Sequence, residues 1–374
     1  MASSSPDLRR AIDRAIAWHR SDAIRVVDAR SPSRGAFRHG FDAARRRPLG
    51  IYTEITGYGV SLFVFLKRAR EDRSFLDVAE EAGDFLVRIQ AADGSFPDSR
   101  DPADPAVPRK HFSFDTAACV VGLARLARST GHTRHAEAAA RAGPWLLRMQ
   151  RPDGSFCAMT DHDLRLEDPG GFFGDGSCIH AKNAIALLEL RALTGEDRYR
   201  DAAARCCDHT ISLQDGDGAF FCTPRRDEVF THAHAYACEG LLYAGRALGE
   251  GRYVSAAELG ARWLQGSQRR GGGWPARAKL TGPARERVAH ALVGPLPADA
   301  AAQAVRLFAL LGSPFDDARR RAVRFLAGFQ GRAGGLAYRR TRLGYSSMLY
   351  TWPTQFAIQG FTWDGVAATI HDLF

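Results

Sequence analysis

The sequence has no long apolar run, no Cys-x-x-Cys pair and no leader-like segment, and each absence narrows its class. No apolar stretch reaches about 18 residues, which argues against a membrane span. The first residues, Met1 to Asp13, lack the charged, apolar and cleavage regions of a signal peptide, so we expect a cytoplasmic protein. The 7 cysteines are odd in number, which indicates buried thiols in a reducing compartment rather than a disulfide framework.

Lysine is also scarce. Lysines make up only four of the 51 basic residues, and the arginines are scattered along the chain, although the formal net charge is +9. We therefore expect no nucleic-acid partner, while the basic balance remains compatible with an acidic substrate. The hydrophobic fraction of 45% suffices for a sizeable core, and nothing resembles a linker, which favours one domain over residues 1–374.

What the sequence does contain is a repeat. An amphipathic helix ends in glutamine, and a Gly-rich turn and an apolar, mostly aromatic residue follow. The glutamines, spaced by 60, 64, 54 and 62 residues, are Gln90, Gln150, Gln214, Gln268 and Gln330. A recurrence of this kind is the mark of a repeat architecture. Glycine can adopt a positive φ and close the last helical turn, and glutamine can bond exposed backbone between neighbouring units.

A second helix, rich in Ala, Gly and Leu, follows each turn. We expect these helices to begin near Glu54, Asp115, Cys178, His232, Ala298 and Pro353. The helices that precede them are expected to end near Ala29, Gln90, Gln150, Gln214, Gln268 and Gln330. Small residues on several faces indicate a buried helix, and a charged stripe indicates a solvent-facing one. Six inner helices alternating with six outer ones describe an all-α fold, an (α/α)6 toroid; three-helix repeats and an open solenoid are the alternatives.

If the inner helices run the same way, their N-termini meet at one mouth of the ring. The candidate catalytic residues there are His232, Tyr236, Glu54, Asp115 and Tyr58. His232 and Tyr236 share one helical face, and both residue types move protons near neutral pH when their surroundings tune them. Structural readings stay open, since Asp115 can cap its helix and Glu54 can complement the helix dipole.

Further residues near the same mouth are candidates for binding substrate. They are His234, His180, Asn183, His111, Tyr52, Tyr345, Tyr350 and Trp352. Aromatic rings suit a sugar or an apolar ligand, and helix N-termini favour an anionic group. The fifth repeat, around Arg285 to His290, is harder to align with the others.

Three short clusters offer possible metal ligands. They are Asp161-His-Asp163, Cys206-Cys207-x-His209 and His232-x-His234. The clusters lack the Cys-x-x-Cys or His-Glu-x-x-His spacing of known zinc sites, so we expect no metal and no cofactor.

The glutamine and glycine repeats resemble the QW repeats of squalene and oxidosqualene cyclases and of protein prenyltransferase β subunits. This resemblance covers most of the chain and implies the scaffold. The acidic Asp-x-Asp-Asp motif of those cyclases is missing here, and the zinc-ligand set of the prenyltransferases does not fall into place over residues 217–240.

Over about residues 48 to 363, the chain also resembles (α/α)-toroid proteins of bacterial polysaccharide gene clusters. The segments that match their pattern are Glu54-Ile-Thr-Gly-Tyr58, Phe114-Asp-Thr116, and Thr231-His-Ala-His-Ala-Tyr236 with Gly240-Leu-Leu242. The segments that match in part are His180-Ala-Lys-Asn183 and Tyr350-Thr-Trp-Pro-Thr-Gln-Phe356. The resemblance implies a glycan-related role.

Our leading hypothesis is a carbohydrate-active enzyme that binds an anionic, uronic-acid-type saccharide and abstracts a proton next to its carboxylate, as a lyase or C5-epimerase. His232 would be the base and Tyr236 or Tyr58 the partner acid. Glu54 and Asp115 would orient the substrate or act as acids; alternatively they form the carboxylate pair of a glycoside hydrolase. An isoprenoid or other small-molecule cyclase or transferase and a non-catalytic glycan-binding toroid are further alternatives. The sequence does not fix the oligomeric state.

Overall fold

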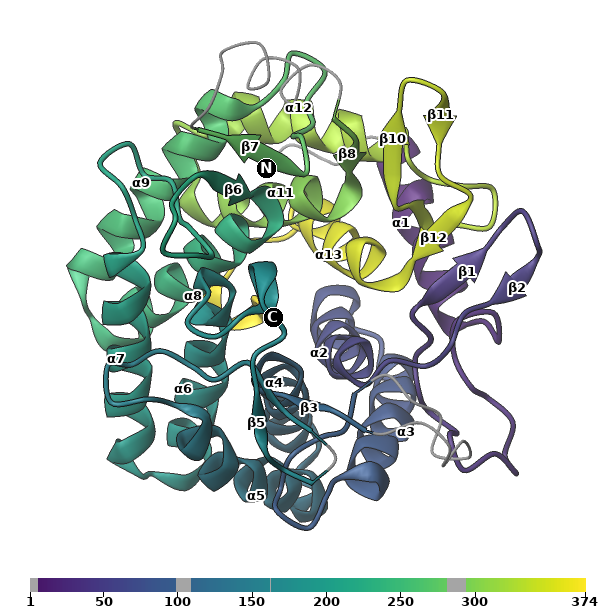
Figure 1. The fold of residues 1–374 in the computed structure, drawn as a ribbon. Helices are drawn as coiled ribbons and strands as arrows, with labels where there is room; N and C mark the ends of the chain where they lie inside the picture. The colour runs from purple at the N-terminus through teal and green to yellow at the C-terminus, as the bar shows by residue number, and fades with distance from the viewer. Residues whose placement is uncertain (1–5, 99–108, 162, 281–293) are drawn as a thin grey trace.

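The protein folds as a closed ring of helices, an (α/α)6 toroid (Figure 1). The computed structural model describes residues 6–98, 109–161, 163–280 and 294–374. Within these residues the inner helices are α2 (Thr53–Arg70), α4 (Ser113–Thr130), α6 (Asn183–Thr194), α8 (Thr231–Leu248), α11 (Ala298–Leu311) and α13 (Thr351–Thr362). The outer helices are α1 (Pro6–Arg20), α3 (Ser74–Ile89), α5 (Thr133–Met149), α7 (Asp197–Ser212), α9 (Gly251–Ser267) and α12 (Asp316–Ala327). The 3₁₀ segment η2 (Cys178–Lys182) leads directly into α6.

Contacts between neighbouring inner helices run around the whole ring. Helix α2 packs on α4, α4 on α6, α6 on α8, α8 on α11, α11 on α13, and α13 returns to α2. Because α13 also packs on α1, the first helix of the chain completes the last pair. The predicted closed toroid is therefore confirmed, and an open solenoid is ruled out.

Five inner helices start at or within two residues of the predicted positions, whereas the third, predicted from Cys178, begins there only as the 3₁₀ segment η2 and becomes α-helical at Asn183. The end predicted for the first outer helix was wrong. That helix was expected to run to about Ala29, whereas α1 ends at Arg20. The Ser21 hydroxyl group donates to the Trp18 carbonyl at 2.7 Å, and the chain then leaves the helix to bury Ile24 in the core. The residues that follow form a loop that makes an isolated antiparallel β-bridge, and an α-helix cannot make that pairing.

The repeated glutamines hold neighbouring outer helices together, as predicted. Each donates through its side-chain amide to the carbonyl of the turn glycine and to a carbonyl of the next outer helix. Gln90, for example, donates to Ala138 at 2.8 Å, and Gln330 donates across the closure to Ala11 of α1 at 2.7 Å. The turn glycine Gly334 has φ of 105°, and a Cβ on it would lie 2.3 Å from the Arg14 carbonyl oxygen. These contacts explain why the turn requires glycine.

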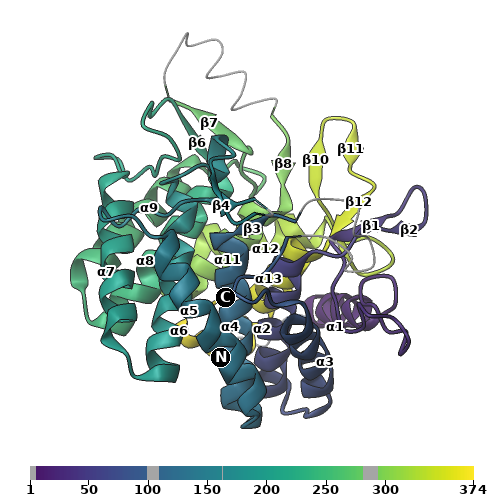
Figure 2. The same cartoon turned by 60° about the horizontal axis from the view of Figure 1, so that its bottom comes forward.

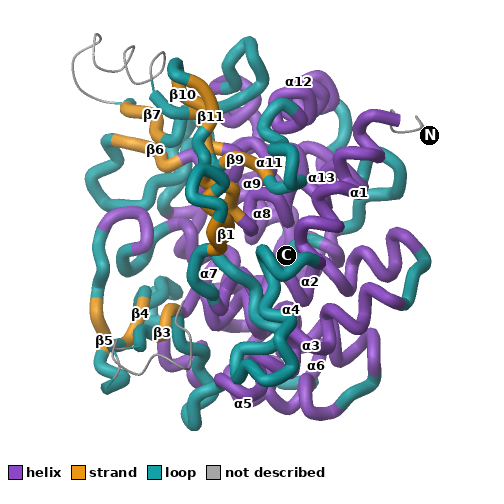
Figure 3. The backbone as a smooth tube through the Cα atoms, turned by 90° about the vertical axis from the view of Figure 1, so that its right-hand side faces the viewer, coloured by secondary structure: helices purple, strands orange, loops and turns teal. Residues whose placement is uncertain are grey.

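Short antiparallel strands gather at the end of the ring where the inner helices begin (Figures 2 and 3). They are β1 (Gly40–Asp42), β2 (Arg47–Pro48), β3 (His111–Phe112), β4 (Met159–Thr160), β5 (Leu166–Glu167), β6 (Glu228–Phe230), β7 (Arg277–Lys279), β8 (Leu296–Pro297), β9 (Leu336–Ala337), β10 (Arg339–Thr341), β11 (Gly344–Tyr345) and β12 (Met348–Tyr350). The pairing of β1 with β12 sets Gly40 opposite Tyr350 and so joins the first and last repeats at this end.

The other end of the ring is filled by the residues around the 3₁₀ turn η3 (Ile370–Asp372) and the two that follow it. Arg125 donates to the carbonyls of Asp372 and Leu373 at 3.1 and 2.9 Å, and Arg306 donates to that of Phe374 at 2.8 Å. Phe374 is 1% exposed and packs on Phe356. Among the described helices, none is long and apolar enough to cross a membrane.

Candidate active site

A pocket of about 460 Å³ opens at the end where the inner helices begin. Much of the pocket wall comes from one position in the repeat. The second residue of each inner helix described, or of η2 in front of α6, faces the axis of the ring. These residues are Glu54, Phe114, Ile179, His232, Asp299 and Trp352. Its size is within the range of pockets that enclose a small ligand. Of the predicted residues, the pocket brings together His232, Tyr236, Glu54, Tyr52, Tyr350 and Trp352.

His232 and Asp299 form the first polar group of the pocket. Burial lowers the pKa of His232, while the nearby Asp299 carboxylate acts in the opposite direction and Arg277 adds to the lowering. Burial raises the pKa of Asp299, against the effects of His232 and of a hydrogen bond from Trp352. A neutral imidazole beside a carboxylate is a suitable proton acceptor at neutral pH.

A second histidine, His39, stands in a wall of aromatic rings. Its ring centroid lies 4.8 Å from that of Tyr350, 5.1 Å from that of Trp352 and 5.4 Å from that of Tyr52, and each pair is stacked. Burial lowers the pKa of His39 to about 4, so its imidazole is neutral at physiological pH. His39 neighbours α2 and α13, whereas His232 is on α8, three inner helices from α2 in either direction. The two imidazoles therefore enter the pocket from different sides.

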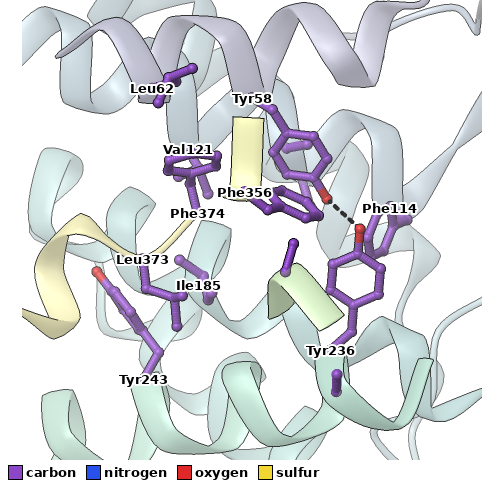
Figure 4. Close-up of a cluster of buried hydrophobic side chains, with 14 of the residues drawn as sticks. Tyr58, Leu62, Phe114, Val121, Ile185, Tyr236, Tyr243, Phe356, Leu373 and Phe374 are labelled. Atoms are coloured by element: carbon purple, nitrogen blue, oxygen red, sulfur yellow. Dashed lines mark hydrogen bonds between the residues drawn. The ribbon is translucent and has the colours of Figure 1, made fainter. Parts of the chain in front are cut away.

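Glu54 lies above a floor formed by two tyrosines. Burial raises the pKa of Glu54 to about 7, and a hydrogen bond from Tyr58 and the charge of Lys182 counteract part of this rise. The Tyr58 and Tyr236 hydroxyl groups are 3.5 Å apart, and Tyr236 also lines the pocket (Figure 4). Lys182 lies 5.3 Å from the centroid of the Tyr236 ring. A carboxyl group with a pKa near neutrality can both donate and accept a proton there.

The charge of Lys182 is held by a buried ion cluster beneath that floor. Lys182 contacts Glu239 at 3.1 Å, and Arg306 donates to both carboxylate oxygens of Glu239 at 2.6 and 2.9 Å. Arg306 also lies 3.9 Å from the centroid of the Phe356 ring. Two cations thus share one carboxylate, which leaves a net positive charge below the pocket.

Asp115 and Tyr58 are not lining residues: Asp115 lies behind the pocket wall, and Tyr58 contributes to the floor only through its contact with Tyr236. Asp115 is 3% exposed, and burial, followed by the charges of Glu54 and Asp98, raises its pKa well above its ordinary value. A hydrogen bond from Tyr52, which lines the pocket, acts the other way. Asp115 is the third residue of α4 and not its N-cap. Its contact with Tyr52 makes it a support for the wall.

His234 faces outward, away from the pocket. Its Nδ1 accepts from the Phe220 backbone N–H at 3.1 Å, and its Nε2 contacts the Gly260 carbonyl at 3.0 Å. Thr56, Thr116 and Thr354 occupy the same fourth helical position in other repeats, and each accepts from the backbone N–H of the equivalent turn residue. His234 is thus a variant of a repeated structural bond.

The remaining predicted residues also lie outside the pocket. His111 bonds the Ser95 hydroxyl group at 2.7 Å, and His180 contacts the Gly174 carbonyl at 3.3 Å. Asn183 is fully buried at the start of α6. Tyr345 is 49% exposed on β11, where it packs on Phe329. None of these side chains lines the pocket.

Several pocket residues were missed by sequence reasoning. They are His39, Asp299, Arg277, Phe114, Phe172, Phe230 and Tyr338. Asp299 could have been found from its position, because it is the second residue of a correctly predicted helix. The segment predicted for the fifth repeat, Arg285 to His290, lies outside the described residues. His39 precedes the first inner helix and carries no repeat signal.

The clusters considered as metal ligands do not converge. His209 bonds the Gly176 carbonyl at 2.9 Å, and the cysteines in the described ranges are free and buried. His162 lies outside the described residues. In the part of the chain that the structure describes, no group of three His, Cys, Asp or Glu side chains is placed to hold a metal ion.

Comparison with known proteins places the fold among solved toroids. No family model and no curated protein sequence matches the chain. A sugar epimerase from a ruminal bacterium aligns with a TM-score of 0.78 at 14% identity, over 95% of this chain and 97% of that one. Cellobiose 2-epimerase from Spirochaeta thermophila aligns with a TM-score of 0.71 at 16% identity, over 97% and 98% of the two chains. The unsaturated glucuronyl hydrolase from Bacillus sp. GL1 aligns with a TM-score of 0.68 at 15% identity, also over 97% and 98%. At these identities the likeness concerns the fold.

Proposed function

We propose that the protein is a sugar epimerase or isomerase that abstracts a proton from the carbon next to the carbonyl group of a reducing saccharide. The observation that carries this proposal is the placement of two neutral imidazoles, His232 and His39, in one aromatic pocket. Epimerisation requires a proton to leave one face of a carbon and return to the other. Bases on different sides of a bound sugar suit that requirement.

The pocket supplies the other groups that such a reaction needs. His232 would remove the proton, with Asp299 stabilising the imidazolium that forms. Glu54, with a pKa of about 7, would exchange a proton with the sugar oxygen that becomes negative in the enediolate. His39, after taking up a proton from solvent, would return a proton to the opposite face of the carbon, and His232 would then release its own proton to solvent. The aromatic rings of Tyr52, Tyr350, Trp352 and Phe172 would stack on the sugar and exclude water.

The solved toroids support this choice of chemistry. A sugar epimerase and a cellobiose 2-epimerase share the fold, and their names describe inversion at a sugar carbon. Our sequence-based hypothesis of proton abstraction next to a carboxylate, by a lyase or C5-epimerase, uses the same step on a different carbonyl group. We now favour a reducing sugar because the titratable residues that line the pocket interior, Glu54 and Asp299, are acidic and would repel a bound carboxylate. The cations Lys182 and Arg306 lie beneath the floor, do not line the pocket, and are paired with Glu239.

The decisive experiment is incubation with cellobiose, mannose and glucose in D₂O, followed by ¹H NMR. We expect deuterium at the carbon next to the carbonyl group and new anomeric signals from the epimer or ketose. Substituting His232→Asn should abolish both. Absence of deuterium uptake across a broad set of reducing sugars would refute the proposal.

A glycoside hydrolase is the second candidate, because a protonated Glu54 could also act as a general acid. New reducing ends released from an oligosaccharide, without deuterium exchange, would establish hydrolysis. Incubation with glycuronan oligomers tests the lyase hypothesis in the same series, since elimination creates an absorbing double bond.

A further inference from the structure

The charges of the pocket differ between its interior and its rim. Glu54 and Asp299 lie inside, and Asp299 is only 5% exposed. Arg277, at the start of β7, is the single lysine or arginine among the described residues that line the pocket, and its side chain is 54% exposed. An anion entering the pocket would therefore meet a cation at the rim and acidic groups below it.

Two contacts hold the Arg277 side chain at this rim. Its guanidinium group lies 4.6 Å from the centroid of the Phe230 ring, and β7 pairs with β6 so that Arg277 faces Phe230 in register. Phe230 itself lines the pocket and is 7% exposed. The Glu228 carboxylate forms an ion pair with Arg277 at 3.7 Å, a distance too long for a hydrogen bond, so it does not occupy a guanidinium donor. The guanidinium group is thus oriented by an aromatic ring while most of its donors remain open to a ligand.

We propose that Arg277 is a specificity-determining residue that binds an oxyanion on the sugar unit next to the reacting one. This inference rests on the proposed function, because it assigns the reducing sugar to the acidic interior. The substrate class that follows is an acidic disaccharide or oligosaccharide with a reducing end. The neighbouring unit carries a carboxylate, sulfate ester or phosphate ester.

The chemistry of arginine supports this assignment. A guanidinium group makes paired hydrogen bonds with the oxygens of a carboxylate, sulfate or phosphate. Stacking on an aromatic ring leaves those donors free at the edge of the group. A neutral sugar would use the same interior but would make no charged contact at the rim. Preference for the acidic substrate therefore depends on Arg277 alone among the lining residues described.

Calorimetry and kinetics with matched disaccharides test the proposal. The probes are cellobiose, the disaccharide in which glucuronic acid replaces its non-reducing glucose, and a 6-sulfated cellobiose. The variants are Arg277→Gln, Arg277→Lys and, as control, Arg324→Gln, which changes an exposed arginine of the outer helix α12. We expect the wild type to bind the acidic probes more tightly than cellobiose. Arg277→Gln should lower the preference for the acidic probes over cellobiose about tenfold, as expected for loss of one charged contact.

The other outcomes are equally informative. Arg277→Lys should retain part of the preference, and Arg324→Gln all of it. Comparing uronate with sulfate identifies which oxyanion fits. Equal binding of neutral and acidic probes by the wild type, binding of none of them, or an unchanged preference in Arg277→Gln would overturn the inference. Deuterium exchange on cellobiose tests the proposed function separately. If no exchange is seen, the proposed function fails, but a preference for acidic disaccharides measured by calorimetry would still stand.

Discussion

The hydroxyl groups of Tyr58 and Tyr236 lie 3.5 Å apart, although the two tyrosines come from inner helices on opposite sides of the ring. Two inner helices lie between α2 and α8 in either direction around the ring. The two side chains can meet because the ring is narrow and both fill its axis. Figure 4 shows this contact within the buried side chains at the ring axis. Tyr58 also hydrogen-bonds Glu54, and Tyr236 lines the pocket, so the contact links two helices of the candidate site.

His232 and His234, two residues apart, should respond oppositely to substitution. His232→Asn should lower kcat by about 10²–10⁴-fold, the range for loss of a general base, with little change in the free energy of unfolding. His234→Ala should lower the free energy of unfolding by about 1–3 kcal/mol, because the buried Phe220 N–H loses its acceptor. Steady-state kinetics and urea denaturation on both variants check this, and loss of catalysis in folded His234→Ala alone would contradict the assignment.

Glu54 should make the protein less stable as the pH rises. Its pKa is about 7 in the folded state against an ordinary value of 4.5, so the folded state holds the proton more tightly. The stability from this proton is fully present below pH 4.5 and is lost as the pH rises through 7. The total difference is on the order of 3 kcal/mol. Urea denaturation from pH 4.5 to 8 should show this decrease in the wild type and a smaller one in Glu54→Gln. Equal slopes would show that Glu54 is not perturbed.

Two glycines with positive φ allow the stability cost of backbone strain to be measured apart from the cost of a steric clash. At Gly334 an added Cβ would meet the Arg14 carbonyl at 2.3 Å, whereas at Gly344 nothing lies within 4 Å. Gly344→Ala should therefore cost about 1 kcal/mol from strain alone. Gly334→Ala should cost clearly more, because the α1–α12 closure must shift. Thermal and chemical denaturation measure both, and equal costs would mean that the closure yields freely.

The buried Glu239 should be far more costly to neutralise than an exposed carboxylate. Glu239→Gln leaves Lys182 and Arg306 facing each other without a full counter-charge, which we expect to cost about 3–5 kcal/mol. The exposed Asp317, paired with Arg320, provides a matched control. Asp317→Asn should change the free energy of unfolding by less than about 1 kcal/mol. A small effect at Glu239 would mean that water reaches the cluster.

The toroid and most of its helix starts were predictable from sequence because each repeat carries the same local requirements. A glutamine must reach the next helix and a glycine must take a positive φ, so both residues recur at a recognisable spacing. Asp299 was accessible by the same logic, since it follows the predicted start of α11 by one residue.

The direction in which each polar side chain points was harder to predict. His232 and His234 look alike in sequence, but the second helical position faces the axis and the fourth faces the preceding turn. His39 reaches the pocket through the pairing of β1 with β12, which joins residues about 310 positions apart. Local periodicity does not encode that pairing.

The arginine-bound residues that fill the far end of the ring make the pocket blind. Whatever enters must leave through the same opening, so a long glycan cannot be threaded through the hole and processed in its middle. If the substrate is a polymer, only its terminal unit can enter the pocket, and each binding event engages one chain end.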